Sequence, residues 1–202
     1  MVLSTPVERV TRGNDGAFRL HTGGETQGTI TCARLVLSPG LGATDLAGTL
    51  ALPSGYGPPP TYFAKGQYYA LSGRSPFSRH IYPMPDGAWL GLHATVDIGG
   101  RCKFGPDIEW IPSIDYSFDV TKLEKFLGFI RSYYPGLDAT RLHADYTGIR
   151  PKLYREGEPV PDFRIDGPSA HGAERLALLY GIESPGLTAA LAIGEMVSEL
   201  VA

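Results

Sequence analysis

Hydrophobic residues in the first part of the chain fall into short runs that Gly-rich turns separate. Three such runs contain Thr, Val or Ile and cover residues 6–11, 17–22 and 27–33. The turns between them are Gly13-Asn14-Asp15-Gly16 and Gly23-Gly24. Short runs of β-forming residues bounded by turn signals are typical of strands. We therefore predict an antiparallel meander of three strands.

More strand patterns follow the meander. An apolar run at 34–38 predicts a strand, and a short helix-like stretch follows it as far as Leu50. Tyr, Trp, Ile and Leu between Gly and Pro residues then predict an antiparallel sheet. Its expected strands are 66–72, 80–84, 89–95 and 96–98, and later strands are expected at 146–153 and 163–166. The intervening segment 101–112 is expected to be a loop.

The segment 122–133 carries the clearest helical period in the chain. Apolar residues recur at helical spacing at Leu123, Phe126, Leu127, Ile130 and Tyr133. This spacing predicts a surface helix with one buried face. Thr121 and Glu124 form a capping-box pattern at its start, and Pro135-Gly136 is a stop signal.

The C-terminal region reads as a buried strand, a Gly/Pro turn and an Ala-rich helix. The strand is 176–180, the turn is 181–186, and the helix continues toward the end of the chain. Glu195, Ser198 and Glu199 form its single polar stripe, which predicts a helix buried over most of its circumference. The turn exposes backbone N–H groups at a helix start, where an electronegative ligand atom is readily stabilised.

Composition narrows the class of protein. The 202 residues are 43% hydrophobic and 19% charged, which is typical of a globular protein. The net charge of −3 and the lack of a basic cluster argue against nucleic-acid binding. Cys32 and Cys102 lie far apart, so neither a disulfide framework nor a zinc site is expected. No signal-peptide pattern and no run of about 18 apolar residues is found, so we expect a cytoplasmic protein.

Three motifs do not support an obvious chemistry. Gly40-Leu41-Gly42 follows a strand, but Asp45 stands where a dinucleotide fingerprint needs a third glycine. The five histidines show no metal-binding spacing, so no metal is expected. Ser184 lies outside a GxSxG setting, which argues against a serine hydrolase.

Two other residues are candidates for chemistry. His93 ends an apolar strand where side chains can line a cavity, and imidazole is a common general base. Arg150 lies in a predicted strand between Ile149 and Pro151, and two interpretations remain open. It either forms an ion pair at a strand end or binds a carboxylate with both guanidinium nitrogens.

Six blocks in order give the chain a family resemblance over nearly its whole length. They are Lys65-Gly66-Gln67-Tyr68-Tyr69, Ile81-Tyr82-Pro83-Met84-Pro85, Leu90-Gly91-Leu92-His93-Ala94-Thr95, Phe104-Gly105-Pro106-Asp107, Gly148-Ile149-Arg150-Pro151-Lys152 and Gly181-Ile182-Glu183-Ser184-Pro185-Gly186-Leu187-Thr188. Together they resemble the FAD-dependent oxidoreductases related to D-amino-acid oxidase and glycine oxidase. The L-2-hydroxyglutarate dehydrogenase-like branch is the most similar.

The resemblance implies an α+β fold in which an antiparallel substrate-binding sheet with helices joins part of an FAD-binding α/β domain. Residues 1–60 would belong to the FAD-binding domain, 61–145 to the substrate-binding domain, and 146–202 again to the FAD-binding domain. Family members open with a βαβ unit bearing GxGxxG, which this sequence lacks. We therefore expect the C-terminal portion of such an enzyme, from a truncated, split or mis-started gene.

Site residues follow from the same resemblance. FAD would contact residues in the turns and strands that match the family motifs: Val7, Gly40, Leu41, Gly148, Ile182, Glu183, Gly186, Leu187 and Thr188. Ser38-Pro39 departs from the family's small-residue pattern beside Gly40. The substrate would contact Lys65, Tyr82, His93 and Arg150.

The implied reaction is the oxidation of a 2-hydroxy acid, or of an amino acid, to a 2-oxo acid by hydride transfer to flavin. Arg150 would hold the substrate carboxylate, and His93 would accept the hydroxyl proton. The alternative is that the chain is not an enzyme by itself. It would then be an inactive remnant, or a subunit that needs a partner chain carrying the dinucleotide-binding half.

Overall fold

The structure, a computed structural model, describes residues 1–84 and 91–202. The chain divides into two compact units. Unit 1 comprises Met1–Tyr62 and Pro151–Ala202, and unit 2 comprises Phe63–Arg150. Each unit has its own sheets and its own hydrophobic core. The assignment of FAD-binding and substrate-binding roles to 1–60, 61–145 and 146–202 stays a prediction.

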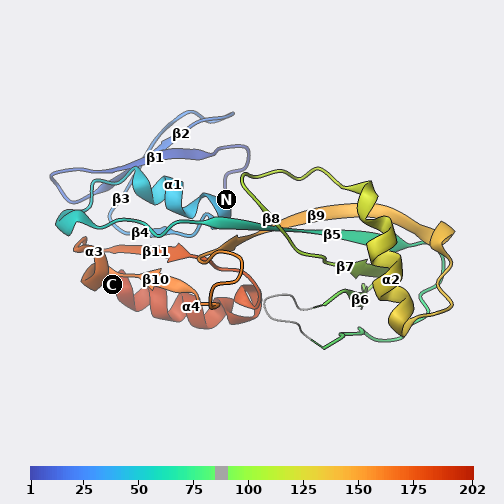
Figure 1. Cartoon of the computed structure of the whole chain (residues 1–202). Helices are drawn as coiled ribbons and strands as arrows, with labels where there is room; N and C mark the ends of the chain where they lie inside the picture. Colours follow the sequence, from blue (N-terminus) through green and yellow to red (C-terminus); the bar gives the residue numbers. More distant parts are fainter. Residues whose placement is uncertain (85–90) are drawn as a thin grey trace. The chain divides into compact units, whose positions relative to one another are not determined.

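Unit 1 begins with the predicted meander, shown in blue in Figure 1. Its antiparallel strands are β1 (Val7–Arg12), β2 (Phe18–Thr22) and β3 (Gly28–Cys32). Val10 and Phe18 are fully buried and pack into the main core of the unit. The three-stranded meander is therefore confirmed.

The second sheet of unit 1 carries the C-terminal strand in its centre. Its order is β10 (Arg164–Asp166), β11 (Leu176–Tyr180) and β4 (Leu35–Leu37), with β11 parallel to β4 and antiparallel to β10. All five residues of β11 are buried. The short helices of the unit are η1 (Gly40–Gly42), α1 (Ala43–Gly48), η2 (Pro53–Gly55) and α3 (Pro168–His171). Mainly antiparallel pairing, with one parallel pair and few helices, agrees with the predicted α+β class.

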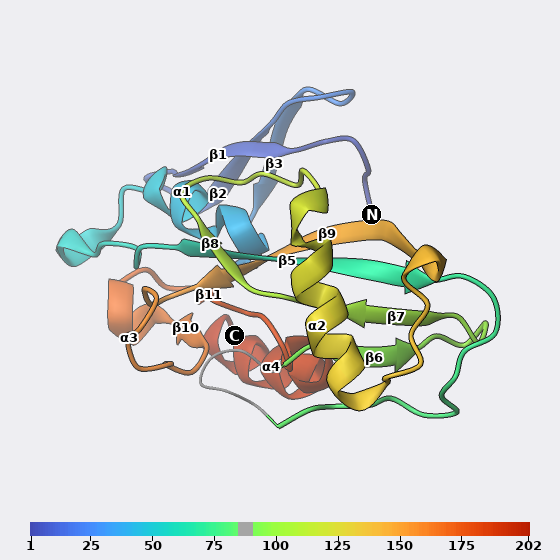
Figure 2. The ribbon, with the colours of Figure 1, turned by 45° about the vertical axis from the view of Figure 1, so that its right-hand side comes forward.

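Unit 2 contains a sheet with one face covered by a helix (Figures 1 and 2). Its strands are β5 (Tyr62–Leu71), β6 (His93–Val96), β7 (Cys102–Gly105), β8 (Glu109–Ile111) and β9 (Leu142–Lys152). The order is β6-β7-β5-β8, and β9 also pairs with β5. Two short helices of this unit, η3 (Val120–Lys122) and η4 (Ala139–Arg141), precede and follow the covering helix.

The covering helix α2 (Leu123–Tyr133) is the predicted surface helix. Phe126, Leu127 and Ile130 are buried on its inner face against strand residues such as Phe104. The predicted Thr121 capping box is wrong, because η3 precedes α2 and Asp119 provides the cap. The carboxylate of Asp119 accepts hydrogen bonds from the backbone N–H and the hydroxyl of Thr121.

Several predicted strand boundaries in this unit are also wrong. Residues 80–84 form no strand, and only Ile81 forms a bridge, to Ala94. Residues 97–100 form a turn after β6 instead of a strand. The predicted loop 101–112 contains β7 and β8, which form because β5 and β6 supply pairing partners. Positions 89 and 90 of the predicted strand 89–95 lie outside the described residues.

The C-terminal helix α4 (Gly186–Leu200) forms as predicted, but it is not buried over most of its circumference. Only Gly186 and Val197 are buried. Leu187 and Leu191 are 93% and 91% exposed. These two residues lie four positions apart, so α4 presents an apolar stripe that the described residues leave uncovered.

Candidate functional site

The first part of the candidate site lies at the carboxyl ends of the parallel strands β4 and β11 in unit 1. Leu35 pairs with Leu176, and Leu37 pairs with Leu178, so both strands end at the same edge of the sheet. At this edge the chain leaves β4 through Gly40 and leaves β11 through Gly181. In open α/β sheets this edge is where ligands bind.

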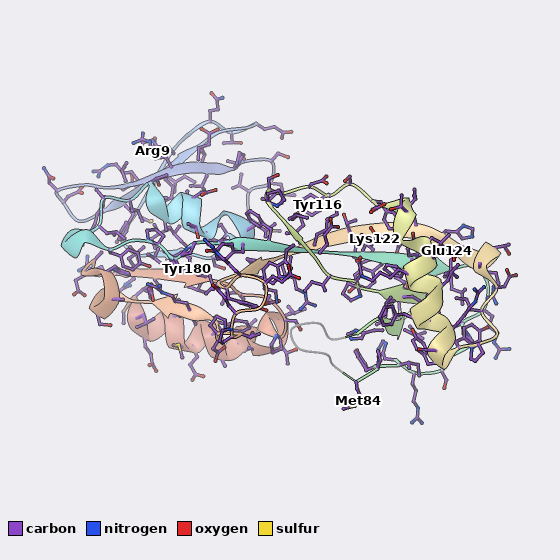
Figure 3. The ribbon with its side chains drawn as sticks, viewed as in Figure 1. Arg9, Met84, Tyr116, Lys122, Glu124 and Tyr180 are labelled. Atoms are coloured by element: carbon purple, nitrogen blue, oxygen red, sulfur yellow. The ribbon has the colours of Figure 1, made fainter. Side chains whose placement is uncertain are left out.

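Both exits require glycine. Gly40 has a φ of +62° and Gly181 a φ of +66°, values that are costly for residues with a β-carbon. A β-carbon on Gly181 would also lie 2.7 Å from Cγ of Leu153. The buried Tyr180, marked in Figure 3, is the last residue of β11 before this turn. The turn is therefore packed closely on its own unit.

The turn leads into α4 without a side-chain cap. The N–H of Gly186 donates to the carbonyl of Glu183. Contrary to the prediction, this amide is therefore not available to a ligand. The first helical hydrogen bond runs from the N–H of Ala189 to the carbonyl of Pro185, at 3.0 Å. Among the described residues, no hydrogen bond is found for the N–H groups of Leu187 and Thr188.

These two amides border a hollow of about 320 Å³ whose walls are residues 182–188. Unpaired amides and the helix dipole both favour a partial negative charge at this position. The predicted contacts Leu187 and Thr188 therefore fit the electronegative edge of a flavin. Ile182 also lines the hollow, and it packs on a cluster formed by Ala177, Leu179 and Val197.

The carboxylate of Glu183, also a predicted FAD contact, binds a protein group. Its Oε1 lies 2.6 Å from Nζ of Lys152, and both side chains are largely buried. Val7 is half-buried on β1 and packs against the core of unit 1. Gly148 lies on β9 with open space where a β-carbon would project.

The second part of the candidate site is the sheet face of unit 2 that lies opposite α2. His93 pairs with Gly105, while Tyr69 pairs with Phe104, whose side chain faces α2. Since side chains alternate along a strand, His93 and Tyr68 both point to the opposite face. The predicted residue His93 is therefore placed on an aromatic surface of the sheet.

Two aromatic contacts organise this face. The rings of Tyr68 and Tyr146 stack with centroids 4.6 Å apart and planes 15° apart. The exposed ring of Tyr82 meets the buried imidazole of His93 edge-on, with the two ring centroids 4.4 Å apart. Sequence reasoning missed Tyr68 and Tyr146 as site residues, although the former lies in a quoted family block.

Electrostatics connects Arg150 to the same face. Burial raises the pKa of Tyr68 to about 12, and Tyr146 also raises it, while the positive charge of Arg150 opposes the rise. Tyr146 and Arg150 lie four residues apart on β9, so alternation puts them on one face. The structure thus brings Arg150, Tyr82 and His93 to a shared surface around Tyr68.

Lys65 does not join this surface. It lies on the other face of β5, where it is buried and its Nζ is 3.3 Å from Oδ2 of Asp115. Hydrogen bonds from Ser117 and, as a smaller cause, the contact with Lys65 lower the pKa of Asp115 to about 2. The predicted substrate contact from Lys65 is therefore not supported, because register turns this side chain toward the opposite side of the sheet.

Comparison with known proteins defines the family. Residues 1–200 match the family DAO, described as FAD dependent oxidoreductase. The chain is 43% identical over 176 residues to an L-2-hydroxyglutarate dehydrogenase, mitochondrial, from Arabidopsis thaliana. This alignment covers 81% of the chain and 36% of the relative. The chain therefore belongs to the DAO family of FAD-dependent oxidoreductases.

Solved structures share the fold. L-alpha-glycerophosphate oxidase from Mycoplasma pneumoniae, described with FAD bound, superposes with a TM-score of 0.78 at 20% identity. Glycine oxidase from Bacillus cereus gives a TM-score of 0.70 at 18% identity. Each match covers 98% of this chain but 50% and 49% of those chains. The chain thus spans about half the length of these structures.

The described residues lack two further features. No helix in residues 1–84 and 91–202 is long and apolar enough to cross a membrane. Over the same residues, no group of three or more His, Cys, Asp or Glu side chains could hold a metal ion.

The close packing of the turn predicts that Gly186→Ala is destabilising. A β-carbon there would lie 2.6 Å from Cγ2 of Ile182, and relieving such an overlap costs about 1–3 kcal/mol. Gly194→Ala in the same helix is the control, because its β-carbon meets open space and alanine favours a helix by about 1 kcal/mol. Urea unfolding should show changes of opposite sign, and equal changes would contradict the packing argument.

Proposed function

We propose that this chain supplies the flavin-contacting and substrate-contacting parts of an FAD-dependent oxidoreductase that converts a 2-hydroxy acid to a 2-oxo acid. The observation that carries the proposal is the uncapped start of α4, which follows the carboxyl end of β11 beside that of β4 in unit 1. Leu187 and Thr188 would hold the electronegative edge of FAD, with Gly40 and Leu41 at the neighbouring strand end. When bound, FAD supplies the acceptor for the hydride that leaves the substrate.

Unit 2 would bind and orient the substrate. The planar guanidinium of Arg150 can hold a carboxylate with two parallel hydrogen bonds, which fixes the orientation of the adjacent carbon. The imidazole of His93 would accept the proton of the substrate hydroxyl, and Tyr82 packs edge-on against this ring. The aromatic rings of Tyr68 and Tyr146 would keep water away from the reacting groups.

The substrate class is proposed from two sources. Arg150 favours an organic acid, and the Arabidopsis relative is named for L-2-hydroxyglutarate. An amino acid is the alternative substrate, since a glycine oxidase shares the fold. The cytoplasmic location predicted from sequence stays a prediction, and the relative's own name places that enzyme in mitochondria.

A second candidate function is that of a subunit that needs a partner chain for the dinucleotide-binding half. The exposed apolar stripe of Leu187 and Leu191 favours this candidate, because such a stripe is normally covered. Partner binding there would bury the stripe and bring phosphate-binding groups that the sequence lacks. An inactive remnant would lack both flavin binding and such a partner.

Flavin binding separates these candidates. The purified chain should take up FAD and keep visible flavin absorbance through gel filtration if it is competent alone. If it takes up FAD only when mixed with the part of the Arabidopsis relative that this chain does not match, the partner candidate is supported. A chain that stays colourless under both conditions would overturn the proposal.

Substitution of the two proposed substrate groups should affect different kinetic constants in flavin-loaded protein. Arg150→Ala should raise KM for the acid about a hundredfold, because a charge-assisted pair worth a few kcal/mol is lost. His93→Ala should lower kcat by roughly 10²- to 10⁴-fold, the usual contribution of a general base.

His143→Ala on β9 is the matched control, because this side chain is exposed and has no proposed role. Its constants should stay close to those of the unmodified protein. Unchanged kinetics in both the Arg150 and His93 variants would remove the substrate-site assignment.

A further inference from the structure

The long strand β5 of unit 2 changes its pairing partner in the middle. It pairs with β8 up to the pair Lys65–Glu109 and with β7 from the pair Tyr69–Phe104 onward. Between these two ladders, three residues of β5 (66–68) lie opposite four residues of the facing chain (105–108). One extra residue on one of two paired strands is a β-bulge, and we call this one the 105–108 bulge.

The extra residue decides which side chains share a face of the sheet. Paired residues of an antiparallel ladder lie on the same face. If the β8 register continued without the bulge, Tyr69 would pair with Gly105, and Gly105 would face α2. The observed partner of Tyr69 is Phe104, so Phe104 enters the core under α2 and Gly105 lies on the opposite, open face. His93 pairs with Gly105 and therefore lies on the open face as well.

Two glycines allow the bulge to approach β5 closely. A β-carbon on Gly105 would lie 2.6 Å from the carbonyl oxygen of Gln67 and 2.7 Å from Cδ1 of Tyr68. Gly105 also has a φ of +145°, which residues with a side chain rarely adopt. A β-carbon on Gly66 would lie 2.7 Å from the carbonyl oxygen of Asp107. The ring of Tyr68 therefore lies directly against the backbone of the bulge.

A buried carboxylate holds the bulge on β5. The side chain of Asp107 is 1% exposed, and its Oδ1 accepts the backbone N–H of Gln67 at 2.8 Å. Its Oδ2 lies 2.9 Å from Nζ of Lys122, which Figure 3 labels at the start of α2. A carboxylate that water does not reach is stable only with such donors. Asp107 therefore links the bulge both to β5 and to the helix that covers the sheet.

The side chain of Gln67 fixes the same part of β5. Its amide nitrogen donates to the carbonyl of Asp119 at 2.9 Å, and its Oε1 accepts the N–H of Asp119 at 3.1 Å. Together with the bond to Asp107, three hydrogen bonds hold this fully buried residue. Tyr68 follows Gln67 directly in the chain, so a shift of Gln67 would move the Tyr68 ring.

We propose that Asp107 is a positioning residue of the proposed substrate face. Its carboxylate fixes the 105–108 bulge to β5, and so it holds the ring of Tyr68 and the strand partner of His93 in place on the open face. The role of this face in catalysis rests on the proposed function. The hold of Asp107 on Tyr68 rests on contacts within unit 2 alone.

Hydrogen exchange on the full chain without cofactor tests the hold on β5. Asp107→Ala removes the acceptor, so the N–H of Gln67 should exchange about tenfold faster relative to those of Tyr69–Leu71. Glu109→Gln is the matched control, because Glu109 binds the same Lys122, at 2.6 Å, and should leave this ratio unchanged. Equal acceleration of all these amides in Asp107→Ala would show a general loss of stability and would overturn the proposal.

The position of the Tyr68 ring can be read from the α-protons of Gly105. These protons lie beside the ring, so its ring current shifts their NMR signals, and Tyr68→Leu measures the size of this effect. Asp107→Ala should remove most of the effect, and Glu109→Gln should keep it. A loss of stability alone does not move the signals of the folded state. A folded Asp107→Ala protein with unchanged Gly105 signals would therefore overturn the proposal.

A milder variant serves if Asp107→Ala does not fold. Asp107→Asn keeps the size of the side chain but offers one uncharged oxygen to two donors. The N–H of Gln67 should then still exchange several times faster relative to those of Tyr69–Leu71. Unchanged exchange of Gln67 in this variant would overturn the proposal.

Kinetics of flavin-loaded protein test what the hold contributes to the reaction. With L-2-hydroxyglutarate as substrate, Asp107→Ala should lower kcat about tenfold, because groups around the reacting carbon are displaced. KM should change little, since Arg150 lies on β9, outside the bulge. Glu109→Gln should keep both constants. An unchanged kcat in Asp107→Ala would overturn the contribution of Asp107 to the reaction.

This proposal and the proposed function can fail separately. If the unmodified protein oxidises none of the 2-hydroxy acids and amino acids tried, the proposed function fails. The exchange of Gln67 and the signals of Gly105 still decide whether Asp107 sets the position of Tyr68.

Discussion

The parallel pairing of β4 with β11 is the constraint on which the proposed flavin site depends. This register places the exits of two strands that are 141 residues apart at one edge of a buried sheet, since Leu35 pairs with Leu176. One exit leads to Gly40 and the other to the turn before α4. Without this pairing, the uncapped amides of Leu187 and Thr188 would have no neighbouring backbone turn from β4, and the proposed flavin site would lose one of its two sides.

In unit 2 the packing of helix α2 determines which face of the sheet stays open for the proposed substrate. It buries one face of the sheet through Phe126 and Ile130, and so it leaves the other face for the Tyr68, Tyr146 and His93 side chains. The alternation of side chains along a strand explains why Lys65 and Tyr68, three residues apart on β5, differ in environment. Lys65 faces inward to Asp115, whereas the neighbours of Tyr68 include Arg150. Strand register therefore selects which residues are available for chemistry.

Local patterns in the sequence predicted the elements whose formation depends on local chemistry. The apolar period of α2, the Gly turns of the meander and the apolar run of β11 were correctly interpreted for this reason. Strands β7 and β8 were missed because their few residues become strands only by pairing with β5 and β6. Residues 80–84 were predicted to be a strand but do not form one, because Pro83 has no N–H to donate to the hydrogen bonds of a sheet.

The candidate site was predictable in part for similar reasons. The family motifs pointed to His93, Arg150 and the turn before α4. The stack of Tyr68 on Tyr146 and the pair of Lys152 with Glu183 join distant residues, so only the fold could reveal them. The most direct measurement is anaerobic mixing of flavin-loaded protein with L-2-hydroxyglutarate. The visible absorbance of oxidised flavin should be lost, and unchanged absorbance with every 2-hydroxy acid and amino acid tried would contradict the proposed function.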